Sequence, residues 1–127
     1  MDDFIYEDIA VNSHRRNMSL GLRMTDELYK SQRVEIYNSE AFGRCLYLDG
    51  ALQCSEADER IYHETLVHTC FGERERKSVL IIGGGDGGTL REVLKYKDKG
   101  LEKVTFVEIN PEVIEACKKH FPQTELE

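Results

Sequence analysis

The chain has 127 residues, 40% hydrophobic and 32% charged, which suits one globular domain or two small ones. Its formal net charge of −7 argues against nucleic acid as a partner and is compatible with cationic ligands. No apolar run reaches the roughly 18 residues of a membrane span, and Asp2 and Asp3 stand where a signal peptide is basic, so we expect a cytoplasmic protein without membrane contact.

Residues 1–54 are predicted to form an antiparallel β-domain. Residues 5–11 and 20–24 have strand-like patterns that fit one hairpin. The polar stretch between them, residues 12–17, leaves the register of that hairpin open.

The clearest strand pattern follows. Val34 and Ile36 alternate with polar neighbours, residues 38–43 supply turn residues, and residues 45–48 return as a second strand. Asp49-Gly50 then predicts a two-residue hairpin turn, because both central positions of that turn need a positive φ.

Residues 55–77 are predicted to be a linking helix followed by a charged connector. Ser55 is expected to open the helix, with Asp58 three residues later completing a capping box. Gly72 is placed to end it.

The pattern of this helix bears on both packing and metal binding. Tyr62, Leu66 and Cys70 share one stripe, most of which we expect in the core. His63 and His68 approximate the His-Glu-x-x-His signature of zinc proteases, but the second histidine comes one residue late. Five helical positions rotate by about 140°, so the two rings would point apart. We therefore expect no metal site.

Residues 78–127 alternate between strand and helix, as in a parallel sheet with crossover helices. Residues 79–82 fit a buried strand without alternation, and residues 104–109 fit a second strand. The helix between these strands has one apolar face, formed by Leu90, Val93 and Leu94.

The last helix has clear end signals. Asn110 is expected to cap it, with Pro111 at its first position and Glu112 at its positive end. Basic residues at 118–120 lie at its negative end.

The four cysteines have no Cys-x-x-Cys spacing for zinc or redox chemistry. A cytosolic chain keeps such thiols reduced. We expect free thiols in the core, at Cys45, Cys54, Cys70 and Cys117.

The glycine-rich segment after residue 82 carries the chemistry. Gly83, Gly85 and Gly88 satisfy Gly-x-Gly-x-x-Gly, a pattern shared by dinucleotide enzymes and S-adenosyl ligand binders. Asp86 in the middle of the loop would repel a pyrophosphate, so it indicates a cationic ligand. Glu108, at the end of the next strand, is placed to accept both hydroxyl groups of a ribose.

Each acidic residue also has an ordinary structural interpretation. Asp86 could cap the helix that follows the loop by accepting from its free amides. Glu108 could be a solvent-exposed glutamate ahead of a capped helix. These alternatives remain open at the level of the sequence.

Residues 80–94, Leu-Ile-Ile-Gly-Gly-Gly-Asp-Gly-Gly-Thr-Leu-Arg-Glu-Val-Leu, resemble the nucleotide loop of the spermidine synthases, the polyamine aminopropyltransferases. The resemblance covers nearly the whole chain from about Gln32 onward. It includes Phe42-Gly43-Arg44, Leu48-Asp49-Gly50, Gln53, Glu56, Asp58-Glu59, Tyr62-His63-Glu64 and Val107-Glu108-Ile109.

This resemblance implies a small N-terminal antiparallel β-domain followed by a Rossmann-like, methyltransferase-type fold. Residues 78–127 would form only the first half of that second domain, which is therefore truncated. It implies a transferase that moves the aminopropyl group of decarboxylated S-adenosylmethionine to putrescine, making spermidine. The donor is a co-substrate, so no resident cofactor is expected. Association into a homodimer or homotetramer is also implied.

The resemblance also assigns site residues. Donor binding would use Gln32, Gly83, Gly85, Asp86 and Glu108, and the polyamine pocket would use Tyr62, His63 and Asp86. A buried, hydrogen-bonded histidine is the structural alternative for His63, and a strand-edge position is the alternative for Gln32.

The base of the reaction is missing from these motifs. The family places it in an Asp-Ser/Thr-x-Asp-Pro segment after a later strand, and the sequence does not contain that segment. We expect the catalytic aspartate to lie beyond Glu127, and the chain to be a fragment, half of a split enzyme or a truncated reading frame without turnover of its own. A non-catalytic assembly or binding module and a fragment of an S-adenosylmethionine-dependent methyltransferase are the alternatives.

Overall fold

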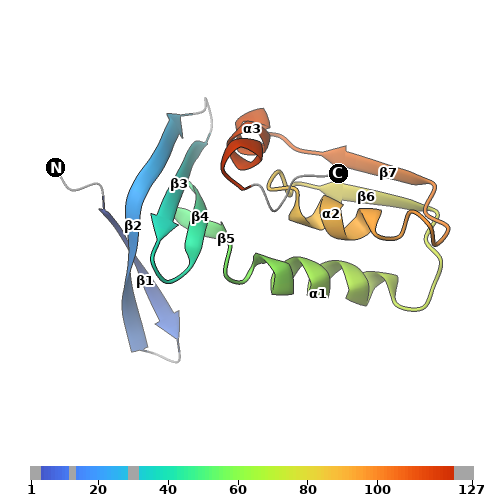
Figure 1. Ribbon diagram of the computed structural model, residues 1–127, viewed down its shortest axis with the longest axis horizontal. Helices are drawn as coiled ribbons and strands as arrows, with labels where there is room; N and C mark the ends of the chain where they lie inside the picture. The colour runs from blue at the N-terminus through green and yellow to red at the C-terminus, as the bar shows by residue number, and fades with distance from the viewer. Residues whose placement is uncertain (1–3, 12–13, 29–31, 122–127) are drawn as a thin grey trace. The chain divides into compact units, whose positions relative to one another are not determined.

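The structure, a computed structural model, describes residues 4–11, 14–28 and 32–121, with side chains from residue 32 to 121. The chain divides into two units, Met1–Ala57 and Asp58–Glu127 (Figure 1). The first helix therefore groups with the second unit rather than forming a separate link.

The first unit is a five-stranded antiparallel sheet in the order β1-β2-β3-β4-β5, as predicted for the β-domain. The hairpin partner of β1 begins at residue 14 rather than at residue 20. The strands are β1 Phe4–Val11, β2 His14–Leu28, β3 Arg33–Ser39, β4 Gly43–Leu48 and β5 Ala51–Ser55.

Strand β3 is buried on both faces, which differs from the alternation expected of it. Val34, Ile36 and Tyr37 are buried, and so is the charged Glu35. The hydroxyl of Tyr37 donates to Glu35 Oε1 at 2.8 Å, and Arg33 pairs with the same oxygen. These partners compensate the charge of a carboxylate that sequence alternation alone would place in solvent.

The turn between β4 and β5 confirms the hairpin prediction. Asp49 and Gly50 have φ values of 52° and 80°. Asp49 Oδ1 also accepts a hydrogen bond from Arg33 N at 2.8 Å, which ties the turn to the start of β3. A local dipeptide preference thus sets the β4–β5 connection.

The second unit begins with helix α1 and contains a two-stranded parallel sheet, confirming the predicted strand and helix order. Strand β7 ends at Val107, so Glu108 follows the strand directly and Ile109 lies outside it. The elements are α1 Glu59–Phe71, β6 Ser78–Ile82, α2 Gly88–Leu94, β7 Lys103–Val107 and α3 Pro111–His120.

The start of α1 differs from the prediction. Ser55 is the last residue of β5, where it pairs with Cys45 of β4, so it cannot open a helix. Asp58 is the N-cap residue instead, without a side-chain capping bond. Gly72 ends the helix as expected, with a positive φ of 55°.

The buried face of α1 is also not the predicted one. Ile61, Tyr62 and Leu66 are exposed, at 69%, 63% and 45%. The buried residues recur every fourth position, at Glu59, His63, Val67 and Phe71. The prediction was wrong because the helix is oriented by its packing on α2, where Val67 and Phe71 join Val93 and Ile81 in one core cluster.

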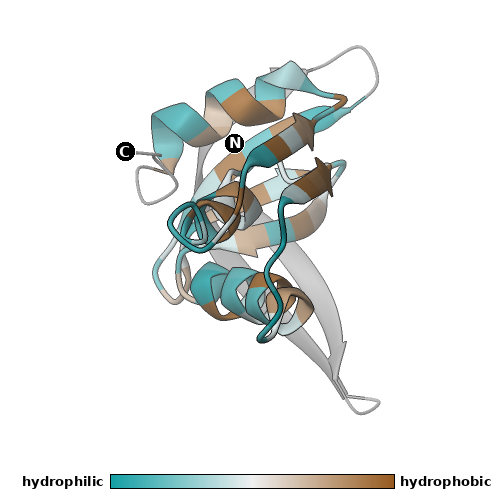
Figure 2. Cartoon of the chain, turned by 90° about the vertical axis from the view of Figure 1, so that its right-hand side faces the viewer, coloured by the Kyte–Doolittle hydropathy of each residue, from teal (hydrophilic) through white to brown (hydrophobic). Residues whose placement is uncertain are grey.

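Strand β6 is not buried on both faces, contrary to the prediction. Ile81 is buried and faces the core with Phe106, its partner on β7. Leu80, Ile82 and Val107 are exposed, and Figure 2 shows hydrophobic residues along both strands. Only one face of this parallel pair is covered, so the two strands alternate like a half-buried sheet.

The capping of α3 confirms the predicted end signals. Asn110 Oδ1 accepts a hydrogen bond from Glu112 N at 3.0 Å, Pro111 occupies the first turn, and residues 118–120 are basic.

Replacing Asn110 with alanine should lower the free energy of unfolding by about 1 kcal/mol, because the amide of Glu112 loses its acceptor. Urea unfolding followed by circular dichroism measures this change. Asn110→Ser keeps a capping oxygen and should cost less. Equal losses in both variants would show that the cap contributes nothing.

The cysteines are all free thiols in the structure, and three of them are buried, at Cys45, Cys54 and Cys117. Cys70 is exposed, so its predicted place in the core was wrong; it lies on the outward stripe of α1 with Leu66. No helix within residues 4–11, 14–28 and 32–121 combines the length and apolar character needed to cross a membrane.

Candidate functional site

The glycine-rich loop joins the end of β6 to the start of α2. Gly83, Gly84 and Gly87 have φ values of 81°, 76° and 83°, in the left-handed region that glycine adopts without steric cost. The amide of Gly83 donates to Val107 O at 2.7 Å, which holds the loop against the end of the neighbouring strand.

Gly85 is needed for a close contact within the protein. A Cβ at this position would lie 2.8 Å from Glu108 Oε2 and 2.9 Å from Val113 Cγ1. The amide of Gly85 donates to Glu108 Oε2 at 2.9 Å, and Asn110 N donates to Oε1 at 3.0 Å. Two backbone amides therefore hold the Glu108 carboxylate at the mouth of the loop, and it is partly rather than fully exposed.

Asp86 lies at the centre of the loop. Its Oδ1 accepts from Gly88 N at 2.7 Å, as the capping interpretation predicted, and lies 3.2 Å from His63 Nε2. Within residues 32–121, the structure gives Asp86 Oδ2 no hydrogen-bond partner. Asp86 thus caps α2 with one oxygen, and its side chain is 16% exposed.

Gly88 allows His63 to reach Asp86. A Cβ on Gly88 would lie 2.2 Å from Cε1 and Nδ1 of the imidazole. The ring of His63 is 3% exposed and lies directly over this first residue of α2. The pattern of glycines therefore serves contacts with Glu108 and His63 as well as backbone conformation.

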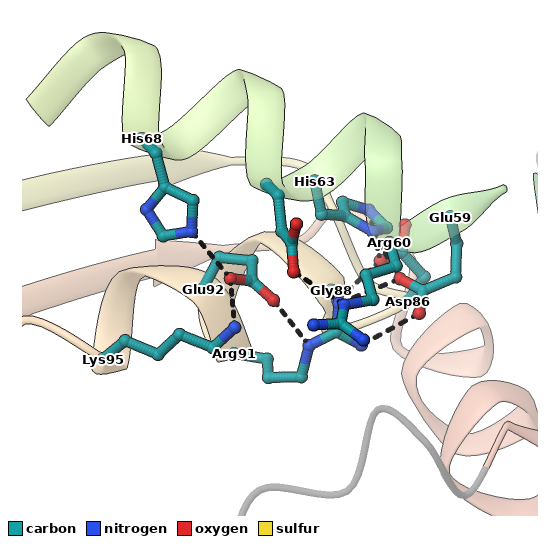
Figure 3. Close-up of polar contacts among 10 residues, drawn as sticks. Glu59, Arg60, His63, His68, Asp86, Gly88, Arg91, Glu92 and Lys95 are labelled. Atoms are coloured by element: carbon teal, nitrogen blue, oxygen red, sulfur yellow. Dashed lines mark hydrogen bonds and ion pairs between the residues drawn. The ribbon is translucent and has the colours of Figure 1, made fainter. Parts of the chain in front are cut away.

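The sequence did not point to the ion-pair network beside this pair. Arg91 donates to both oxygens of Glu59, each at 3.0 Å, and its Nε donates to Glu92 Oε1 at 3.0 Å. Glu92, 1% exposed, also pairs with His68 and Lys95. Figure 3 shows the network between α1 and α2.

The network shifts the pKa values of the central pair. Burial alone would lower the pKa of His63, but hydrogen bonds to Asp86 and Glu59 and their charges raise it above its ordinary value. Burial would raise the pKa of Asp86, but His63, the amide of Gly88 and the charge of Arg91 lower it. Both shifts favour the charged forms.

The structure brings together the predicted site residues of the second unit, and Gln32 belongs to the first unit. Gly83, Gly85, Asp86 and Glu108 form the loop and its rim, and His63 contacts Asp86. Tyr62 is 63% exposed and contacts His63 edge to face, with ring centroids 5.1 Å apart. Gln32 lies immediately before β3, in the other unit.

The described part of the chain, residues 32–121 for side chains, contains no group of three His, Cys, Asp or Glu residues that could hold a metal ion. His63 and His68 instead make hydrogen bonds to carboxylates, and His68 Nδ1 also lies 2.8 Å from the hydroxyl of Tyr96.

Comparison with protein families gives two adjacent matches. Residues 59–127 match the spermine/spermidine synthase domain, and residues 20–56 match the spermidine synthase tetramerisation domain. The chain belongs to the spermine/spermidine synthase family. The family resemblance inferred from the loop motifs is confirmed.

Known relatives are polyamine aminopropyltransferases. The one from Methanocaldococcus jannaschii is 45% identical over 90% of this chain and 40% of its own length. One from Clostridium botulinum is 44% identical over 87% of this chain and 40% of its own length. The chain thus spans about 40% of the length of the relatives it matches.

Solved structures of spermidine synthases have the same fold. The enzyme from Thermotoga maritima aligns with a TM-score of 0.83 and 38% identity over 95% of this chain and 42% of that one. A spermidine synthase in complex with the transition state analogue AdoDATO aligns with a TM-score of 0.82 and 38% identity, over 95% and 41% of the two chains. The predicted fold, an antiparallel β-domain followed by the first part of a Rossmann-like domain, is confirmed.

Part of the missed network had a signal in the sequence. Glu59 and His63 are four residues apart on one helix, a spacing that brings side chains together. The contact between Glu59 and Arg91 spans 32 residues, and no local pattern encodes it. The Glu59–Arg91 pair could therefore be predicted only once the packing of α1 on α2 was known.

The shifted pKa values predict a pH dependence of stability. The stabilisation from His63 is fully present below its ordinary pKa of 6.5 and is lost as the pH rises through its raised folded pKa. The stabilisation from Asp86 is present above 3.8 and is lost as the pH falls through its lowered folded pKa. Between these two ordinary values the pair stabilises the fold most.

Urea unfolding midpoints should therefore be higher at about pH 5.5 than at about pH 8.5 in the wild type, with a smaller difference in His63→Gln. The comparison isolates the imidazole from all other titrating groups. The same pH difference in both proteins would contradict the assignment.

Proposed function

We propose that this chain supplies the donor-binding half of a polyamine aminopropyltransferase. The observation that carries the proposal is Asp86, an ionised carboxylate inside a glycine-rich nucleotide loop, with Oδ1 held by Gly88 N and His63 and Oδ2 directed to no protein partner among residues 32–121. Such a group suits a ligand with a cationic tail.

Decarboxylated S-adenosylmethionine has such a tail. Its propylammonium can pair with Asp86, whereas the carboxylate of intact S-adenosylmethionine would approach the same negative charge. Glu108 would accept the ribose hydroxyls, because its carboxylate is already fixed by Gly85 N and Asn110 N at the loop mouth. Gln32 is proposed to contact the nucleoside.

In the proposed reaction, the amine nitrogen of the acceptor attacks the carbon next to the sulfonium. The new C–N bond forms as the C–S bond breaks, methylthioadenosine leaves as a neutral thioether, and the amine loses a proton to a base. The donor is consumed, so it is a co-substrate and no resident cofactor is needed. Tyr62 and His63 are proposed to line the acceptor pocket, with putrescine as the acceptor.

An amine of pKa near 10 is mostly protonated at neutral pH, so the reaction needs a base. The segment to which the family resemblance assigns that base is absent from the sequence. We therefore expect the chain by itself to bind the donor without releasing methylthioadenosine in the presence of putrescine.

Isothermal titration of the chain with decarboxylated S-adenosylmethionine, paired with chromatographic detection of methylthioadenosine, tests this proposal. Saturable binding without product is the expected outcome. Absence of binding would overturn the donor assignment, and product at ordinary enzyme rates would overturn the assignment of the base outside these residues.

One observation favours assembly as an additional role. Residues 20–56 match a tetramerisation domain, a range that covers the second half of β2 and all of β3, β4 and β5. We propose that the complete protein is a homodimer or homotetramer in the cytoplasm, assembled through this sheet. Sedimentation of the chain at several concentrations tests it, and a monomer at every concentration would argue against this role.

A further inference from the structure

Two residues of the network, Glu59 and Arg91, have no role in the proposed ligand contacts, yet they form an ion pair next to His63. Glu59 is 5% exposed and Arg91 is 19% exposed. Arg91 holds Glu59 with both terminal nitrogens, a fork geometry that fixes a carboxylate in plane. The remaining contact of Glu59 is to His63 Nδ1, at 2.7 Å.

The geometry of His63 favours two protons on its ring. Nδ1 faces Glu59 Oε2 at 2.7 Å and Nε2 faces Asp86 Oδ1 at 3.2 Å. A neutral imidazole has one nitrogen without hydrogen, and that nitrogen would face a carboxylate lone pair. The imidazolium donates on both sides and avoids this repulsion.

Arg91 makes this arrangement electrically balanced. Glu59 and Asp86 are negative, His63 and Arg91 are positive, and the four charges cancel in a site where buried charges need partners. Without the Glu59–Arg91 pair, Asp86 would be the sole negative partner of His63. Without Arg91, the Glu59 carboxylate would lose the two hydrogen bonds that fix its orientation.

We propose that Glu59 and Arg91 are positioning residues for the cation site: they hold His63 as an imidazolium on Asp86 Oδ1, which leaves Oδ2 to accept the ammonium group of the ligand. The inference deepens the proposed function and rests on it for the identity of that ammonium. Neither residue touches the ligand. Each acts through His63.

A coupling between ligand and proton follows from this arrangement. The charged groups that surround His63 are Glu59 from α1, Asp86 from the loop and Arg91 from α2, which stands behind Glu59. On the α3 side, burial and the charge of Asp86 raise the pKa of the Cys117 thiol to about 12, so it stays neutral. An ammonium docking on Asp86 adds a positive charge beside the imidazolium and lowers the pKa of His63. Binding should therefore release a proton.

The ligand-free chain tests the positioning role directly. In Glu59→Gln, and in Arg91→Lys, which keeps the charge and removes the fork, the pKa of His63, read from its ring resonances by NMR, should fall relative to the wild type. Glu64→Gln and Arg60→Lys are the matched controls, because that ion pair also lies on α1 and makes no hydrogen bond to His63. Methyl resonances of Val67 and Val93 report whether each variant keeps the α1–α2 packing.

An unchanged pKa of His63 in both folded variants would overturn the inference. If Glu59→Gln fails to fold, Arg91→Lys decides the question. If both fail to fold, Glu59→Asp keeps the charge while drawing the carboxylate away from His63 Nδ1, and it should lower the pKa of His63 in a folded protein; an unchanged value there overturns the inference equally.

Titration with ligand separates this inference from the proposed function. Wild-type affinity for decarboxylated S-adenosylmethionine should rise with pH through the folded pKa of His63, by up to about tenfold per pH unit. Affinity for methylthioadenosine, which has no ammonium, should stay flat, and the donor dependence should shift to lower pH in Glu59→Gln. If no donor binds, the proposed function fails and the pKa of His63 in the free chain alone decides the inference. If the donor binds with the same pH profile in wild type and Glu59→Gln, the inference fails and the proposed function stands.

Discussion

Replacing Asp86 with asparagine is expected to weaken binding of decarboxylated S-adenosylmethionine by about 10- to 100-fold. A hydrogen bond between two charged groups contributes about 1.5–3 kcal/mol, and the amide cannot replace its charge. Isothermal titration of wild type and variant measures the loss. The side-chain oxygen of asparagine still accepts from Gly88 N, so the cap of α2 survives.

Methylthioadenosine provides the control for this variant, because it has the nucleoside and lacks the aminopropyl group. Its affinity should change by less than about threefold, since Asp86 has no other ligand group to hold. Equal weakening of both ligands would mean that the variant distorts the loop. Unchanged donor affinity would mean that Asp86 only caps the helix.

Replacing Gly88 with alanine is expected to destabilise the chain by about 3 kcal/mol, at the upper end for an overpacked site. The new Cβ would lie 2.2 Å from the His63 ring, between two helices that cannot separate without breaking the Glu59–Arg91 pair. Alanine has a higher helix propensity than glycine, so the expected loss of stability comes from the steric contact with the His63 ring. Urea unfolding measures the change.

The His63→Ala background serves as the control, because it removes the ring. There the Gly88→Ala change should cost nothing or stabilise slightly, since alanine has the better helix propensity. Gly72→Ala is a second comparison, with no atom within 4 Å of the added Cβ and only backbone strain at a φ of 55°. The same cost of Gly88→Ala with and without the imidazole would contradict the packing argument.

Features set by local residues could be predicted from the sequence. The Asp49-Gly50 turn and the Asn110 cap each depend on conformational preferences of one or two residues. The parallel pairing of β6 and β7 followed from the strand and helix order. These predictions needed no knowledge of distant contacts.

Features set by tertiary packing could not be predicted from the sequence. The apolar stripe of Tyr62, Leu66 and Cys70 looked like the core face of α1, but the helix buries the stripe that contains Glu59 and His63. Buried charges carry no hydrophobic signal, because their burial depends on partners elsewhere in the chain.

The site shows the same division. Gly85, Asp86 and Glu108 were identified from the loop motif, and the structure places them together. What the motif did not indicate is why those glycines are there, since Gly85 admits the Glu108 carboxylate and Gly88 admits the His63 ring. Those reasons depend on atoms brought in from β7 and α1.

The most direct measurement compares the dissociation constants of decarboxylated and intact S-adenosylmethionine for this chain under identical conditions. We expect the decarboxylated form to bind at least about tenfold more tightly, because only its tail lacks the carboxylate that Asp86 repels. Equal affinity for the two forms, or preference for the intact form, would contradict the assignment of Asp86 and favour a methyltransferase-type site.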